Sequence, residues 1–169
     1  MTPLIQFNCQ LLKQARDVIK AVDNTELEFS AMVGPHLRHV IEHYQLLLEG
    51  VETGQVDYER RTRGGCIESD PEAALSAIAE LEDALTHRPL PMDAPIKAEF
   101  AVGMVGEEQM AAQSSLGREL QFVGLHAIHH YAFVALALKE AHIALPDGFG
   151  IAPGTRRYTT STEDAASAA

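Results

Sequence analysis

The sequence is poor in cysteine and in basic residues, and it has no long apolar run free of interruption. Cys9 and Cys66 are its only cysteines, too few for a disulfide framework, which favours a reducing compartment. Its 13 basic residues face 24 acidic ones, so a net charge of -11 argues against a nucleic-acid-binding surface. The most apolar stretch, from Phe122 to Leu145, is broken by histidines and charged residues, which predicts a buried helix rather than a membrane span. No signal-peptide pattern opens the sequence, and we expect a cytoplasmic protein with neither nucleic-acid nor membrane partners.

Several common catalytic motifs are also missing. The sequence has no glycine-rich phosphate loop, no nucleophilic serine elbow and no cysteine pair with zinc-finger spacing. What it has instead is histidine. Six of its eight histidines fall in two short clusters, one within Gly34 to His43 and one within Leu125 to His130. Imidazole is the commonest metal ligand in proteins, so these clusters carry the functional argument.

The hydrophobic pattern predicts one domain built from helices. Apolar residues recur at helical spacing over residues 2–22, 34 to 50 or 54, 70–87 and 114 or 115 to 143. Helices of this length with modest links predict an all-α, up-down-type four-helix bundle over residues 1–158. A small β-hairpin within residues 96–113 is expected between the third and fourth helices, and residues 55–70 are expected to form a surface loop. Residues 159–169 are expected to be a disordered tail.

Each histidine cluster contains a pair spaced four residues apart, His39 with His43 and His126 with His130. Positions i and i+4 project from one helix face and can reach one ion. This spacing predicts a divalent metal held between two helices, with zinc, nickel and iron(II) all compatible. The alternative is that these histidines lie at core edges and bond to backbone or carboxylate groups.

A polar stripe on an otherwise apolar helix strengthens the metal interpretation. Glu119, His126 and His130 share one face of the last helix, where an unpartnered buried polar group would cost about 1–3 kcal/mol. Glu119 could bind the ion or orient a ligand, or it could simply lie beside the helix N-terminus. On the second helix, His39 and His43 are the main candidate ligands and His36 is the third.

A basic run in the predicted loop offers a candidate substrate contact. Arg60 and Arg61 could bind an anionic group of a substrate, although a solvated loop explains them as well. No catalytic residue beyond the metal ligands can be named from the sequence.

The segment His36-Leu37-Arg38-His39, followed by His126-x-x-x-His130, resembles the DinB-like superfamily of metal-binding four-helix bundles, which includes the YfiT-like proteins. The resemblance implies His39, His126 and His130 as the three ligands. It further implies a metal-dependent hydrolase or thiol (S-)transferase acting on a small-molecule thiol. The additional His43 departs from a minimal triad and stays open as the first ligand.

Two further functions compete with this interpretation. The chain could be a non-catalytic metal-binding protein, or a structural helical bundle that acts in protein interactions. We also expect a homodimer, because bundles often pair through exposed helix faces.

Overall fold

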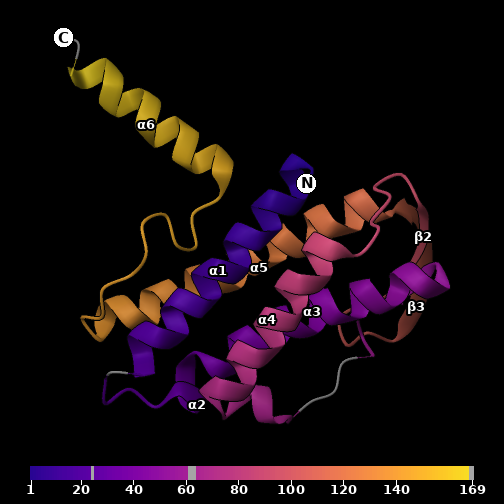
Figure 1. Ribbon diagram of the computed structural model, residues 1–169, viewed down its shortest axis with the longest axis horizontal. Coiled ribbons are helices and arrows are strands. Elements are labelled where there is room, and N and C mark those ends of the chain that lie inside the picture. Colours follow the sequence, from indigo (N-terminus) through magenta and orange to yellow (C-terminus); the bar gives the residue numbers. More distant parts are fainter. Residues whose placement is uncertain (24, 61–63, 168–169) are drawn as a thin grey trace.

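Four long helices form the body of the computed structural model, which describes residues 1–23, 25–60 and 64–167. They are α1 (Pro3–Asp23), α3 (Gly34–Thr53), α4 (Pro71–His87) and α5 (Leu116–Glu140). Both α1 and α3 pack against α4 and against α5, so the four helices surround one shared core (Figure 1). The four helical segments predicted from the hydrophobic pattern are therefore present.

The helix ends follow the local sequence. The Asp70 side chain accepts a hydrogen bond from the Glu72 amide at 2.9 Å and so caps α4, whose first residue is a proline. The Ser115 hydroxyl accepts from the Arg118 amide at 3.3 Å at the start of α5. At the end of α3, Gly54 has a φ of 73°, a left-handed conformation that glycine adopts without steric cost.

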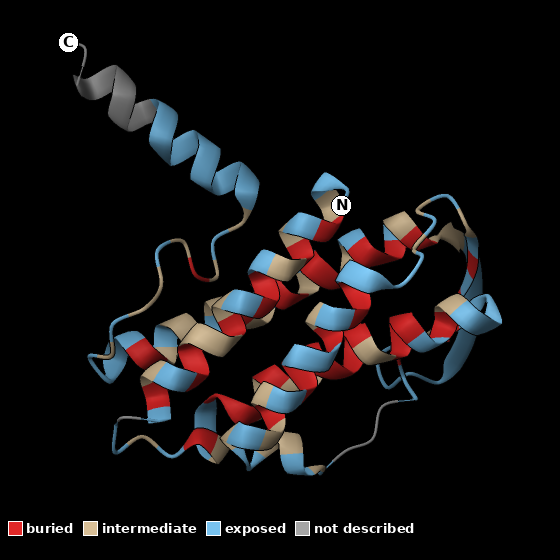
Figure 2. Cartoon of the chain, viewed as in Figure 1, coloured by how far each residue is buried: buried red, intermediate tan, exposed pale blue. Residues whose placement is uncertain are grey.

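Burial is concentrated on the inward faces of these helices, as Figure 2 shows. Tyr44 of α3 and Tyr131 of α5 are the largest fully buried side chains. Each tyrosine hydroxyl is satisfied inside the core, because Tyr44 donates to the Asn8 side chain at 2.7 Å and Tyr131 donates to the Leu11 carbonyl at 3.1 Å.

A three-stranded mixed sheet covers the end of the body where α3 finishes and α5 begins. It consists of β1 (Gln55–Asp57), β2 (Pro95–Val102) and β3 (Glu108–Ser115), in the order β1-β2-β3. The strands β2 and β3 are antiparallel and lie in the segment for which a hairpin was expected, whereas β1 pairs in parallel with β2. The all-α class is therefore wrong.

The error has a physical cause. The strand β1 is only three residues long, too short to show an alternating pattern, and it lies in a segment predicted to be a loop. Its partner strand begins 40 positions later, with Gln55 aligned to Lys97 and Val56 to Ala98. No local feature of the sequence reports a pairing over that distance.

Three short or peripheral elements complete the described chain. They are α2 (Phe29–Met32), a 3-10 turn η1 (Cys66–Glu68) and α6 (Pro153–Ser167). The helix α6 extends away from the other helices and includes most of the segment predicted to be a disordered tail (Figure 1). The hydroxyls of Thr159, Thr160 and Ser161 bond to preceding carbonyls, as Thr160 does to Arg156 at 3.0 Å.

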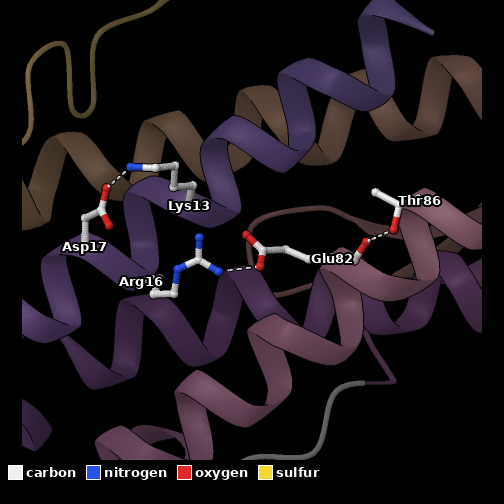
Figure 3. A network of polar contacts seen from close by, with 5 residues as sticks. All are labelled: Lys13, Arg16, Asp17, Glu82 and Thr86. Carbon is white, nitrogen blue, oxygen red and sulfur yellow. Dashed lines mark hydrogen bonds and ion pairs between the residues drawn. The ribbon is translucent and has the colours of Figure 1, made fainter. Parts of the chain in front are cut away.

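Side-chain ion pairs also join the helices. Figure 3 shows Arg16 of α1 donating to Glu82 of α4 at 2.5 Å, while Thr86 donates to the Glu82 carbonyl at 2.8 Å. The pair of Lys13 and Asp17, at 2.6 Å, lies within α1.

Within the described chain, α5 alone has the length and composition that could cross a membrane. This is a weak indication, because a core helix passes the same test, and α5 packs against both α1 and α3.

Candidate metal centre

The two histidine clusters meet at the contact between α3 and α5. On α3, His36, His39 and His43 stand at spacings of three and four residues and so share one helix face. On α5, His126 and His130 do the same. His36 lies beside His130 and His39 beside His126, so the pairs run in opposite order along the two helices, as antiparallel helices require.

Three of these histidines have the spacing of a metal site. One ring nitrogen from each of His39, His43 and His126 lies within 4.8 Å of those from the other two. The closest approach is 2.7 Å, between Nε2 of His39 and Nε2 of His126. Two nitrogens on one tetrahedral zinc ion, with bonds of about 2.0–2.1 Å, stand about 3.3 Å apart, so a small outward movement would admit an ion.

The hydrogen bond of His43 determines which of its nitrogens can bind. Its Nδ1 lies 2.8 Å from the backbone carbonyl of His39, and since a carbonyl oxygen only accepts, Nδ1 carries the proton. The lone pair of neutral His43 is therefore on Nε2. Metal-binding histidines commonly hold their other N–H on a carbonyl in this way, because the bond fixes both the tautomer and the ring orientation.

His130, one of the three ligands predicted from the sequence, is placed differently from His39 and His126. Its Nδ1 lies 2.9 Å from Nδ1 of His36, and its ring centroid is 4.2 Å from that of His39. Burial, followed by the neighbouring charges of His126 and His36, lowers the pKa of His130 to about 3. Burial also lowers the pKa of His36. Both rings are therefore neutral at pH 7, the form that binds metals.

Two aromatic side chains that the sequence did not single out cover the cluster. Tyr58 stacks on His43 with centroids 5.2 Å apart and planes 13° apart, and Phe122 stacks on His126 at 5.7 Å and 24°. Tyr58 lies just after β1 in a segment without periodicity, so no sequence signal places it here. Phe122 precedes His126 by four residues, and that helical spacing could have identified it.

Glu119 holds Tyr58, one of the two aromatic side chains that cover the histidine cluster. Both of its carboxylate oxygens accept hydrogen bonds from hydroxyl groups. The Tyr58 hydroxyl donates to one of its oxygens at 2.9 Å, and Ser114 donates to the other at 2.6 Å. Burial, with the adjacent Glu119 charge, raises the pKa of Tyr58. Glu119 is thus linked to the histidines through Tyr58, which stacks on His43. The sequence had left open whether it binds the ion or orients a ligand.

A cavity of about 480 Å³ adjoins the aromatic cover. Its lining includes Tyr58, Phe122, Glu119 and the exposed Arg118. A small molecule in this cavity would be separated from the histidines by the two stacked rings.

The predicted anion contact Arg60 lies elsewhere. Arg60 is exposed and pairs with Glu49 at 2.9 Å, and the cavity that it lines is a different one from the cavity beside the histidines. Arg61 falls outside the described residues.

A comparison with curated proteins found a relative of part of the chain. The chain is 31% identical over 104 residues to "FK506-binding protein 5" of Rhizopus delemar. This match covers 61% of the chain but only 27% of the relative, most of which therefore has no counterpart here. No protein-family model matches the chain, and no solved structure matches it.

The expected membership of the DinB-like superfamily is wrong, because the curated relative is an FK506-binding protein and no family model supports the resemblance. The YfiT-like assignment and the hydrolase and transferase activities that it implied are corrected with it. The resemblance depended on His-x-x-His and His-x-x-x-His. Such spacings place side chains on one face of any helix, so they carry little information about descent.

Proposed function

We propose that this chain is a divalent-metal-binding protein whose ion is held by His39, His43 and His126. The observation that carries the proposal is the approach of three ring nitrogens to within 4.8 Å of one another, from two different helices. The Nδ1–H bond of His43 to a backbone carbonyl adds to it, since that bond aims the Nε2 lone pair away from the helix backbone.

Three neutral imidazoles with remaining positions open to water form a donor set suited to zinc, nickel or iron(II). The net charge of -11 also favours a cationic ligand. An ion bound here would join α3 to α5 and polarise any water that it held.

The sequence predicted a different third ligand, His130 in place of His43, and the experiment must separate the two sets. Metal-free protein is loaded with one equivalent of Zn²⁺, desalted and measured by elemental mass spectrometry. We expect close to one zinc per chain in the wild type and in His130→Ala, and loss of zinc in His43→Ala and His126→Ala. His129→Ala is the matched control, because His129 is exposed on the same helix.

Each outcome decides between interpretations. Zinc lost in His130→Ala and in His126→Ala but kept in His43→Ala would restore the ligand set His39, His126 and His130. A wild type that retains no zinc, nickel or iron would overturn the proposal, and the histidines would then be core-edge groups that satisfy one another.

A further inference from the structure

The pair formed by His36 and His130 lies outside the three-histidine cluster. Nδ1 of His36 and Nδ1 of His130 are 2.9 Å apart, and the two side chains come from different helices. We propose that this pair is a second divalent-ion site, distinct from the site of His39, His43 and His126.

The geometry of the pair carries the inference. Two ring nitrogens that face each other at this distance share one proton, with one ring donating and the other accepting. If both rings take the Nε2–H tautomer, both Nδ1 lone pairs point into the same gap. The separation of about 3.3 Å expected for two nitrogens on one tetrahedral ion is then reached by a small opening.

An aromatic neighbour holds the His36 ring in place, and a cavity lies beside it. Phe133 stacks on His36 with centroids 5.8 Å apart and planes 12° apart, which fixes the plane of that imidazole. A cavity of about 320 Å³, lined by His36, Phe133 and Met32, adjoins the His36 side of the pair. It also has room for the water molecules that would complete the coordination of an ion with two protein ligands.

The two sites would not be independent. The ring centroids of His39 and His130 are 4.2 Å apart, so two divalent ions would repel each other across that contact. The site of His36 and His130 has two protein ligands against three in the other. We therefore expect it to fill second and to bind more weakly.

The test is the stoichiometry of zinc binding by the metal-free full chain, measured by equilibrium dialysis with elemental mass spectrometry. The wild type should bind two equivalents, and His36→Ala should bind one, the tighter. His129→Ala, the matched control on α5, should still bind two. Copper(II) provides a second measurement, because two neighbouring copper ions broaden each other's paramagnetic resonance spectra. That broadening should disappear in His36→Ala.

The result that would overturn the proposal is zinc binding that does not depend on His36, so that His36→Ala binds as many equivalents as the wild type. If circular dichroism shows that His36→Ala is unfolded, His130→Gln replaces it with the same expectation of one equivalent. His43→Ala separates this proposal from the first. If His43→Ala and the wild type each bind a single equivalent of zinc, and that equivalent depends on His36, the three-histidine site fails and the site of His36 and His130 stands.

Discussion

At the scale of single residues, the core is closely packed around Asn8. This fully buried amide donates to the Leu4 carbonyl at 2.8 Å and accepts from the Tyr44 hydroxyl at 2.7 Å, so it is held at both ends. The backbone of Gly124 on α5 passes close beside it. A Cβ added at Gly124 would lie 2.8 Å from the Asn8 side-chain oxygen, closer than packed atoms tolerate.

Gly124→Ala should therefore destabilise the protein by about 1–3 kcal/mol in urea unfolding, because Asn8 cannot withdraw without losing a hydrogen bond. Alanine favours the helical conformation over glycine by about 1 kcal/mol, which would stabilise the variant. A net loss of stability would therefore show that the packing clash outweighs helix propensity. Gly154→Ala is the control, since nothing lies within 4 Å of the added atom there. Greater stability in Gly124→Ala would show that Asn8 moves freely.

Tyr58 combines two contacts that substitutions can separate. Its hydroxyl donates to buried Glu119, and its ring stacks on His43. Tyr58→Phe keeps the ring but leaves one carboxylate oxygen without that donor, which should cost about 1.5–3 kcal/mol of unfolding free energy. Zinc content should not change in Tyr58→Phe and should fall in Tyr58→Ala, where His43 loses its stacked neighbour. Equal zinc content in the two variants would contradict a role for the ring in positioning His43.

At the scale of elements, the four long helices were predictable because each has a sustained apolar repeat. Asp70 and Ser115, residue types that favour helix starts, cap α4 and α5. Among the elements that were missed, α2 and β1 have four and three residues, too few for a period to appear. The position of β1 depends on its pairing with β2, which is distant in sequence.

The candidate site was likewise predictable from local sequence in part only. The sequence predicts which histidines share a helix face, because that depends only on spacing within one helix. It does not predict whether His43 or His130 completes the cluster, because that depends on how far α3 is shifted along α5. In the structure this shift places His39 against His126 and leaves His130 against His36.

The ion pair that joins α1 to α4 can be compared in energy with the ion pair that lies within α1. The Arg16 and Glu82 side chains are 32% and 23% exposed, whereas Lys13 and Asp17 are 62% and 34% exposed. Double-mutant cycles to alanine should give a coupling of about 0.5–1 kcal/mol for Arg16 with Glu82 and about 0.3–0.5 kcal/mol for Lys13 with Asp17. Raising the salt concentration should weaken the second more. Equal couplings would show that joining two helices adds nothing to this pair.

At the scale of the whole molecule, the histidine contact is a polar seam between α3 and α5, helices that otherwise pack through apolar side chains. Neutral imidazoles can satisfy one another across such a seam, whereas protonated ones repel. The stability of the metal-free protein should therefore respond to pH in the range where free histidine titrates, near its ordinary value of 6.5.

The direction of this pH dependence follows from the lowered pKa values of His36 and His130, the second of which is about 3. Near pH 6 the unfolded chain protonates these histidines while the folded chain does not, so the unfolded state binds more protons and stability falls as pH falls. Their contribution is fully present above the unfolded pKa and is lost progressively toward the folded one. In urea unfolding with a chelator present, the midpoint should be level above about pH 7.5 and should decline steadily toward about pH 5, before most carboxylates titrate. His36→Gln/His130→Gln should show a shallower decline over the same range. A wild-type midpoint independent of pH across this range would mean that the two histidines are as free to take up protons in the folded protein as in the unfolded chain.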